Sequence, residues 1–362
     1  MINKEKLKKV LSIQSESNKQ WRMFAYIIRE VSAMGLEYYV DNGNIYVVKG
    51  DSNKFPCIIA HMDTVHRITT DLTILEFDGK LTGFNTHKMT QSGIGGDDKV
   101  GIFIALECLR QVGTIKAAFF RDEEIGCQGS YNANMDFFND CSYVLQCDRK
   151  GNTDFITSAS GVQLSSNNFQ KDVKSLLDKH KYTTTFGLMT DVMALKESGL
   201  RVSCANVSCG YYNPHCTNEY VVIDDVDNCL QMVLGIMDKL VDHKYKHKHR
   251  YQEPSIHTYP TSTDWSRYGK SYNNHAYTDW YEEDWVDKST TRSREVDKLY
   301  SPSNDYGYCE CCQELSYTLT YSTEFNIEMC GKCSKSYSGT ENDWAKYAPR
   351  VSANPYDGEI PF

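Results

Sequence analysis

Five short segments of the sequence each carry a histidine or carboxylate of the kind that binds metal ions, at the end of an apolar stretch or at a glycine-rich turn. The segments are CIIAHMDTVH, GIGGDDKVG, FFRDEEIG, YVLQCDRKG and NVSCGYYNPH. Their candidate side chains are His61 and Asp63, Asp97, Glu123 and Glu124, Asp148, and His215. Neutral imidazole and carboxylate suit borderline divalent metals, Zn²⁺ above all. The set is large enough to hold two such cations.

The chemistry open to this set is metal-assisted hydrolysis. Two divalent cations that share a bridging carboxylate can activate water and polarise a carbonyl group. A further carboxylate must take the proton of the water and return it to the leaving amine. Adjacent Glu123 and Glu124 supply both kinds of group, because successive residues at a strand end point in different directions. In His61-x-Asp63, residues two apart lie on one side, so Asp63 can accept the second ring N–H of His61 or of another ligand.

Residues 1–242 must position these side chains, and they alternate strand patterns with helix patterns. Apolar runs such as PCIIAHMD, IKAAFFRDEE and CSYVLQCD are typical of strands buried on both faces. DKVGIFIALECLRQVG and VDNCLQMVLGIMDKLV have the apolar spacing of helices. The alternation predicts an α/β fold with a mainly parallel sheet covered on both faces. The carboxylates follow the strands, where sites form in open α/β sheets.

Several local patterns carry predictions of their own. We expect Ser17 to be the N-cap of a helix that extends to Met34, with Gln20 completing a capping box. The residues Asp41-Asn42-Gly43-Asn44, between LEYYV and IYVVKG, predict a hairpin. In GGDDK, the first or second aspartate could also satisfy the first-turn amides of the helix that follows. Asp191 could contact a substrate, but we interpret it as a helix N-cap.

The motif set AHMDTV, GGDDKVG, RDEEIG, CDRKG and YNPH resembles, in order and spacing, that of the co-catalytic dizinc exopeptidases. These include peptidase T, the aminoacylase and carboxypeptidase relatives, and the single-domain zinc aminopeptidases. The resemblance covers roughly residues 55–240 and implies a three-layer, phosphorylase/hydrolase-like zinc peptidase fold with a mixed, mainly parallel sheet. Peptidase T has a lid or dimerisation domain inserted between the fourth and fifth motifs. The stretch between Asp148 and His215 is too short for it, so we expect a lidless layout.

The resemblance also implies how the candidate ligands are shared between two ions. His61 and Asp148 would hold one Zn²⁺, Glu124 and His215 would hold the other, and Asp97 would bridge them. Mn²⁺ or Co²⁺ could substitute for zinc. The residues by themselves leave the last ligand open, because His66 and His87 compete with His215.

By the same resemblance, Glu123 would be the general base and Asp63 would support a ligand from behind. The implied activity is hydrolysis of short peptides, as by an aminopeptidase or a di- or tripeptidase. Removal of the acyl group from an N-acyl amino acid is the alternative, because both reactions are amide hydrolyses that one metal site can perform.

After residue 242 the composition changes. Residues 243–305 contain few aliphatic side chains and many Tyr, Trp, Asp, Ser, Thr and Lys, so we expect a disordered, aromatic-rich linker. Residues 306–337 hold two CxxC pairs separated by a spacer that alternates as strands do. We expect a zinc ribbon there, followed by a disordered tail over residues 338–362.

The ribbon's predicted ligands to one structural Zn²⁺ are Cys309, Cys312, Cys330 and Cys333. Cys311 competes with Cys312, but CxxC geometry favours the latter. A ribbon of this size needs its metal to fold. Its flanks are acidic, which favours a protein partner, and a third interpretation is a binding or adaptor protein that acts through ribbon and linker.

Composition limits the remaining classes. The formal net charge of −9 argues against a nucleic-acid partner. No run approaches the roughly 18 apolar residues of a membrane helix, and the first twenty residues lack the apolar stretch of a secretory signal. We therefore expect a cytoplasmic protein. Most of its 14 cysteines would then be free thiols or metal ligands.

Overall fold

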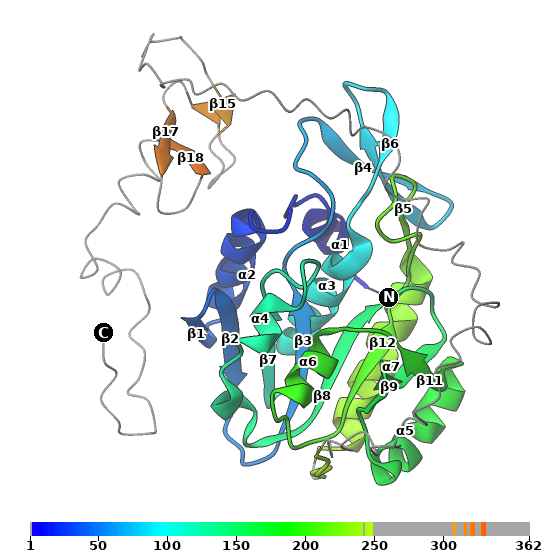
Figure 1. Cartoon of the computed structure of the whole chain (residues 1–362). Helices are drawn as coiled ribbons and strands as arrows, with labels where there is room; N and C mark the ends of the chain where they lie inside the picture. Colours follow the sequence, from blue (N-terminus) through cyan, green and yellow to red (C-terminus); the bar gives the residue numbers. More distant parts are fainter. Residues whose placement is uncertain are drawn as a thin grey trace, which may run out of the picture. The chain divides into compact units, whose positions relative to one another are not determined.

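The computed structural model describes residues 2–241 and 243–248, together with the backbone of four short strands between residues 307 and 330. Helices and strands alternate through residues 4–239 (Figure 1). The helices described there are α1 (Lys4–Leu11), α2 (Trp21–Ala33), α3 (Gly96–Gln111), α4 (Gln128–Tyr131), the 3₁₀ helix η1 (Met135–Phe138), α5 (Asn167–His180), α6 (Asp191–Glu197) and α7 (Ile223–Lys239).

The main sheet has nine strands in the described part of the chain. Its spatial order is β1 (Glu37–Asp41), β2 (Asn44–Lys49), β7 (Ile115–Phe120), β3 (Phe55–His61), β8 (Cys141–Arg149), β12 (Cys204–Ser208), β9 (Asp154–Ala159) and β10 (Val162–Gln163), with β11 (Thr183–Gly187) paired to β9. The central strands β7, β3, β8 and β12 run parallel, and antiparallel strands flank them. The predicted α/β fold with a mixed sheet is confirmed.

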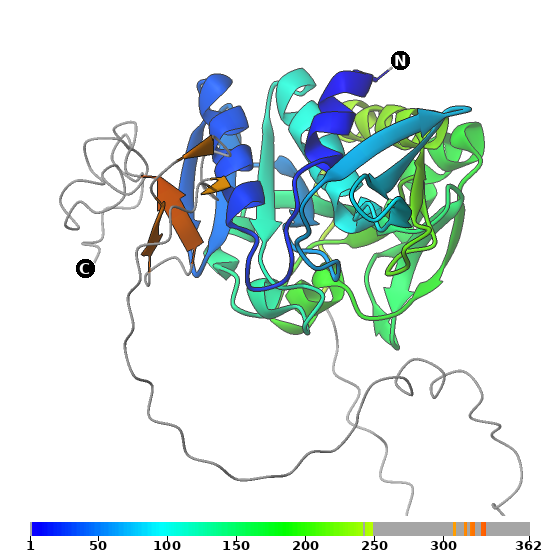
Figure 2. The ribbon, with the colours of Figure 1, turned by 90° about the horizontal axis from the view of Figure 1, so that it is seen from above.

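Alternation along the central strands builds two hydrophobic layers. In β3, Ile58 and Ala60 face one layer, and Cys57 and Ile59 face the other. The first layer contains the apolar sides of α1, α2, α3, α5 and α7, and the second contains η1 and α6. Figure 2 shows the helices α1, α2, α3 and α7 along one face of the sheet. Burial on both faces explains why these strands are continuously apolar.

A second, five-stranded sheet was not predicted. It contains β4 (Leu72–Phe77), β5 (Lys80–Asn85), β6 (Thr90–Ser92), β13 (Tyr211–Tyr212) and β14 (Tyr220–Val222). Strand β5 pairs with β4, β6 and β14. This pairing joins segments far apart in sequence, and it fixes the turn between β13 and β14 at residues 213–219.

Two local predictions had opposite outcomes. The hairpin is confirmed, since β1 and β2 pair antiparallel with Asp41 opposite Asn44. The N-cap at Ser17 is wrong, because α2 begins at Trp21 and its N-cap, Gln20, makes no side-chain cap hydrogen bond. The Ser17 hydroxyl instead donates to a buried carboxylate, an acceptor that no local pattern reveals.

The chain between Asp148 and His215 belongs to the main domain. It forms β9, β10, β11 and β12 of the main sheet, helix α6, and helix α5, which packs on α7. No lid-like insertion interrupts this described stretch, as the short spacing predicted.

Beyond α7, residues 243–248 remain in contact with the main domain. Tyr245 is buried, and Lys246 forms an antiparallel bridge with Val202. Further along, β15 (Gly307–Tyr308) pairs with β16 (Leu315–Ser316), and β17 (Leu319–Ser322) pairs with β18 (Ile327–Cys330). The four predicted zinc ligands of the ribbon have side chains outside the described residues, and so do most of the predicted linker and the whole tail. Among the described residues, none of the helices is both long and apolar enough to span a membrane.

Candidate metal centre

The carboxyl ends of adjacent parallel strands bring most candidate side chains to one edge of the sheet. His61 is the last residue of β3, and Asp148 stands one residue before the end of β8. Glu123 and Glu124 follow β7, the other neighbour of β3. Asp97 is the second residue of α3, where the backbone is not yet helical. Parallel strands therefore supply the convergence that the sequence order suggested.

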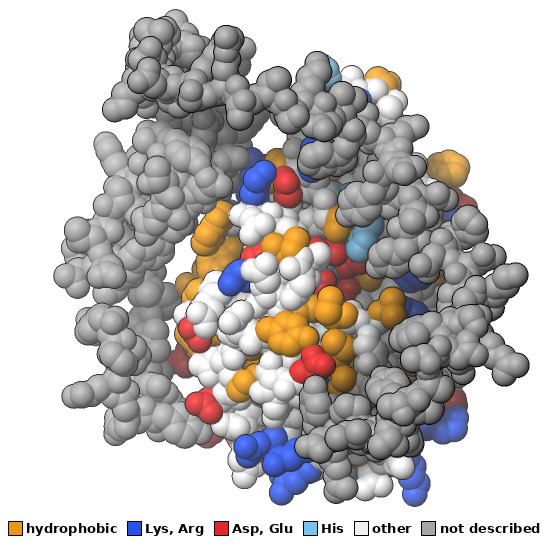
Figure 3. All heavy atoms as spheres, in the orientation of Figure 1, with side chains coloured by type: hydrophobic (Ala, Val, Ile, Leu, Met, Phe, Trp, Pro, Cys, Tyr) orange, Lys and Arg blue, Asp and Glu red, His pale blue; other side chains and the backbone are white. Residues whose placement is uncertain are grey.

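His215 reaches the same place from the second sheet. It lies in the turn between β13 and β14 with a φ of 65°. Its side chain is half exposed, whereas that of His61 is fully buried. Figure 3 shows acidic side chains beside a histidine on this face of the molecule. The site is thus open to solvent on the His215 side.

Two groups of possible ligands share Asp97. In one group, His61 Nε2 lies 3.2 Å from Asp97 Oδ1 and 3.7 Å from Asp148 Oδ1. In the other, His215 Nε2 lies 3.4 Å from Asp97 Oδ2 and 3.1 Å from Glu124 Oε2. Within each group one ligand atom per residue lies within 4.8 Å of the others. Because Asp97 turns a different oxygen toward each histidine, it is placed to bridge two ions.

The residues present fit a pair of divalent cations. Glu124 Oε1 is buried and has no hydrogen-bond partner in the described part of the chain, a costly state for a carboxylate oxygen. Burial, together with the charge of Asp97, raises the pKa of Glu124. A cation would satisfy this oxygen and offset the mutual repulsion of the acids.

The pKa values of Asp148 and His61 also indicate that positive charge stabilises this group of acidic side chains. Burial, with the negative charge of Asp97 beside it, raises the pKa of Asp148 to about 8. Burial would lower the pKa of His61, but contacts with Asp148, Asp63 and Asp97 outweigh it and raise that pKa well above its usual range. The cluster thus favours retained protons where metal ions would otherwise supply the charge.

Glu123 lies beside the two groups rather than within them. Its Oε2 is 3.9 Å from His61 Nε2, and its Oε1 accepts a hydrogen bond from Cys127 Sγ at 3.4 Å. Burial is the main cause that raises the pKa of Glu123 well above its usual range. A buried carboxyl group with a raised pKa binds a proton more readily than an exposed one, which is the property a general base needs when it takes a proton from water.

Asp63 supports both His61 and the turn after β7. The His61 Nδ1 atom is 3.0 Å from the backbone oxygen of Asp63 and 3.5 Å from its Oδ1, so the carbonyl is the closer acceptor. The carboxylate accepts the amide N–H groups of Glu123 and Glu124 at 2.9 and 3.3 Å, and the Ser17 hydroxyl at 2.7 Å. Asp63 therefore orients a possible ligand and the possible base together.

Asp98 secures the start of α3. It follows Asp97 through a cis peptide bond, and its Oδ1 accepts the Gly101 amide at 3.1 Å, which is the capping role anticipated for one of the two aspartates. Its Oδ2 accepts the amide of His61 at 3.1 Å. Asp98 thereby ties the bridging segment to the end of β3.

Asp148 is held by a polar shell that the sequence did not reveal. Gln146 donates to Asp148 Oδ2 at 3.1 Å, and the Tyr211 hydroxyl donates to Oδ1 at 3.1 Å. Asn206 exchanges two hydrogen bonds with the backbone of Asp148. The Thr190 hydroxyl completes the shell through Gln146. These contacts fix the carboxylate before any ligand arrives.

Asp191 is part of this shell and not a helix cap. The N-cap of α6 is Thr190, and α6 has no side-chain cap hydrogen bond. The buried Asp191 carboxylate accepts the Ser130 hydroxyl at 2.6 Å and the Gln146 amide at 3.2 Å. The capping interpretation was wrong because a long-range partner competes successfully with the local amides.

Glu219 is the most important residue that sequence reasoning missed. It is fully buried, and it accepts the amide of Gly95 at 2.7 Å on Oε2 and that of Asp97 at 3.2 Å on Oε1. His66 Nε2 lies 2.7 Å from the same Oε2. His66, one rival of His215, is thus engaged by Glu219, and the other, His87, is exposed.

Glu219 stands four residues after His215 in NPHCTNEY, but its partners Gly95 and Asp97 are more than 120 residues away in sequence, so the local pattern does not mark its role. Its glycine partner Gly95 has a φ of 66°, where a Cβ atom would lie 2.9 Å from the Thr64 side chain. The turn therefore requires glycine, and Glu219 holds it in place.

Comparison with known proteins supports the fold. No protein-family model matches the chain, and no curated protein sequence does so either. Among solved structures, the aminopeptidase PepT of Bacillus cereus is similar over 66% of this chain and 99% of its own, with 14% identity and a TM-score of 0.54. A tripeptidase of Staphylococcus aureus is similar over 67% and 99%, with 15% identity and a TM-score of 0.54.

A TET aminopeptidase from a Thaumarchaeota archaeon gives 66% and 96% coverage, 12% identity and a TM-score of 0.51. At such identities the likeness shows the fold alone: a mixed, mostly parallel α/β architecture that these peptidases share. What the site does must be argued from its own residues.

Proposed function

We propose that the protein is a metal-dependent hydrolase of peptide bonds, an exopeptidase of the aminopeptidase or di- and tripeptidase type. The observation that carries this proposal is the placement of Asp97, which turns one carboxylate oxygen toward each of two histidines. A raised-pKa carboxyl group, Glu123, stands beside this arrangement. The shared fold with solved aminopeptidases and a tripeptidase supports the choice of substrate class.

The proposed ligands follow from the two groups. His61, Asp148 and Asp97 would hold one Zn²⁺, and Glu124, His215 and Asp97 would hold the second. Mn²⁺ or Co²⁺ could take the same oxygen and nitrogen ligands. When bound, two such ions lower the pKa of water and polarise a carbonyl oxygen.

Glu123 would move the proton. One of its oxygens is engaged by Cys127, while Oε2 faces the His61 side of the site. The raised pKa allows Glu123 to accept a proton from the attacking water and then donate it to the leaving amine. Asp63 would keep this carboxylate in place through the amide of Glu123.

Apolar side chains border the proposed ligands along the sequence. Ile125, which follows Glu124 directly, is 43% exposed. Leu188 and Met189, which precede the Thr190 of the Asp148 shell, are 75% and 54% exposed. Figure 3 shows hydrophobic side chains on the same face as the acids and the histidine. We therefore include peptides with apolar side chains in the test panel.

The decisive test is Glu123→Ala, assayed on free-amine dipeptides and tripeptides with added Zn²⁺, Mn²⁺ or Co²⁺. Rate should fall by about two to three decades while two metal ions remain bound, because Glu123 is outside both ligand groups. Glu76→Ala, an exposed glutamate of β4, is the matched control and should retain full rate.

Full activity of Glu123→Ala would refute the assignment of the base. Acyl-blocked amino acids belong in the same panel. Hydrolysis of these alone, with free-amine peptides untouched, would favour a deacylase at the same metal centre.

A further inference from the structure

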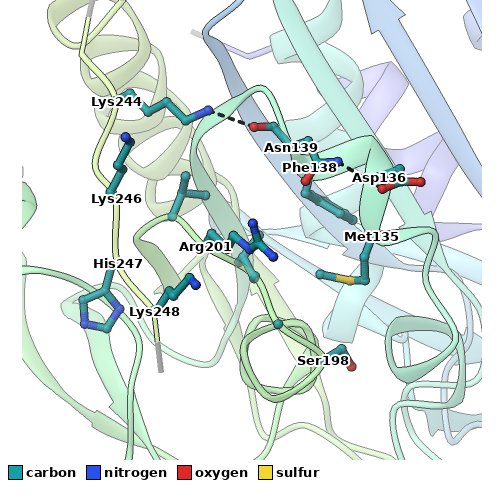
Figure 4. Close-up of a pocket in the computed structure, with 13 residues that line it drawn as sticks. Met135, Asp136, Phe138, Asn139, Ser198, Arg201, Lys244, Lys246, His247 and Lys248 are labelled. Carbon is teal, nitrogen blue, oxygen red and sulfur yellow. Dashed lines mark hydrogen bonds between the residues drawn. The ribbon is translucent and has the colours of Figure 1, made fainter. Parts of the chain in front are cut away.

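A hollow lies at the opposite edge of the main sheet from the metal centre. Its volume is about 660 Å³, and it is lined by the segments that precede β8 and β12 and by the extended segment 244–248 (Figure 4). Asp148 is at the far end of β8, which places it roughly 20 Å away at about 3.3 Å per residue. We call this hollow the basic pocket, after its cationic residues Arg201, Lys244, Lys246 and Lys248.

The basic pocket has a fixed backbone. The Ser203 amide donates a hydrogen bond to the Tyr245 carbonyl, and the Tyr245 amide donates one to the Ser142 carbonyl. The His247 amide donates to the carbonyl of Arg201 at 2.8 Å. In this extended segment successive side chains point in opposite directions. Tyr245 points into the domain and is buried, so its two lysine neighbours in the sequence point away from the core. The cations are therefore presented by an anchored segment.

A buried lysine strengthens both the anchoring and the charge. Lys196, in α6, is 1% exposed, and its Nζ donates to the carbonyls of Val202 and His247 and, at 3.4 Å, to that of Leu200. Its ammonium group thus joins the wall of the pocket to the segment 244–248. It adds a fixed positive charge behind a surface that is already basic.

The positive charge of the basic pocket is not balanced by the described residues around it. Asp136 is the single acidic residue that lines the pocket, and its Oδ1 accepts a hydrogen bond from Asn139. Lys244 donates to the Asn139 carbonyl. Arg201, Lys246 and Lys248 form no ion pair with a residue that the structure describes. In a protein with a net charge of −9, such a cluster is conspicuous.

The pocket also has an apolar wall. Phe138, Leu200 and Val202 line it and are almost fully buried, and Met135 lies beside them. In Figure 4, Met135 and Phe138 stand on one side, the three lysines on the other, and Arg201 between them. A volume of this size suits a small organic ligand.

We propose that the basic pocket binds a phosphate-bearing organic anion of nucleotide size. Its phosphates would contact Arg201 and the lysines through charge-assisted hydrogen bonds, and its apolar part would lie against Met135 and Phe138. This site is separate from the proposed hydrolytic centre, and its existence does not depend on that function.

The test is calorimetric titration of the full-length, metal-loaded protein with ATP, tripolyphosphate and adenosine at about 0.15 M salt. ATP should bind, tripolyphosphate should bind more weakly, and adenosine should not bind. The double variant Lys246→Glu/Lys248→Glu should lose affinity for ATP at least about tenfold, because two attractive contacts become repulsive. Peptide hydrolysis should be unchanged, since both side chains are exposed and remote from the metal centre.

Lys171→Glu, an exposed charge reversal on α5, is the matched control and should bind ATP like the wild type. Equal ATP affinity in the double variant and the wild type would place the ligand elsewhere, the metal centre included, and would overturn the proposal. So would the absence of ATP binding in the millimolar range. Tight binding of a single-stranded oligonucleotide with none of ATP would instead identify a nucleic-acid surface.

Discussion

At the scale of single residues, Glu219 shows how a side chain outside the metal groups can control them. It accepts two backbone amides, one on each oxygen, from the turn that leads to Asp97. A carboxylate can do this because both its oxygens are acceptors. An amide side chain offers one acceptor and places an NH₂ group against the second N–H. The position of Asp97 therefore depends on the two acceptor oxygens of Glu219.

We predict that Glu219→Gln lowers the affinity of the proposed metal centre for divalent ions by about 10- to 100-fold, in line with the loss of other outer contacts to metal ligands. Competition with a chromogenic chelator measures this affinity. Glu107→Gln, which removes an acid paired with Arg110 on the same helix α3, is the control and should bind metal normally. Unchanged affinity in Glu219→Gln would show that Asp97 is held by the rest of α3.

At the scale of elements, parallel strands and the small second sheet act together. The strands β3, β7 and β8 end at one edge, which is a property of their direction. His215 lies in the turn before β14, and the pairing of β14 with β5, which is far away in sequence, places this turn beside the ends of those strands. The extended segment 243–248 is a further element, and it completes the packing of α5 through Tyr245, whose ring lies 5.1 Å from that of Phe169.

Tyr245→Ala should therefore destabilise the domain by about 3 kcal/mol, as expected for truncation of a buried aromatic side chain. Tyr245→Phe removes only the hydrogen bond to Asp172 and should cost about 1 kcal/mol. Urea unfolding monitored by circular dichroism gives both values. Equal stability of Tyr245→Ala and the wild type would mean that segment 243–248 does not stabilise the folded domain.

At the scale of the whole molecule, two kinds of metal site are proposed in one chain. The proposed catalytic pair would be held by side chains of the main domain, whereas the proposed ribbon would be held by four cysteines near the C-terminal end of the sequence. The two kinds of site use different ligands, so they should respond independently to deletion.

We predict about three zinc ions per full-length chain, and about two after deletion of residues 300–340. Elemental analysis of the dialysed protein gives this count. The paired substitution Cys330→Ser/Cys333→Ser is the matched control and should also leave two. One ion per chain, lost on deletion, would favour the adaptor interpretation over the enzyme.

Much of the fold was predictable because its signals are local. Buried runs such as Phe55–His61 and the turn between Asp41 and Asn44 depend on a few neighbouring residues. The helix start at Ser17 and the cap at Asp191 failed for the opposite reason. Each of these side chains has a distant partner, Asp63 in one case and the Gln146 shell in the other, which outweighs the local amides.

The sequence by itself determined which side chains could bind metal, since residue type and motif order define a set of ligands. The family resemblance already implied how that set would be divided between two ions, and the tertiary structure decided which atoms face one another. It turned one oxygen of Asp97 toward His61 and the other toward His215, and it placed Glu219 behind them. It also assembled the basic pocket from three separate segments. These arrangements rest on contacts between residues far apart in the chain, and local patterns carry no record of such contacts.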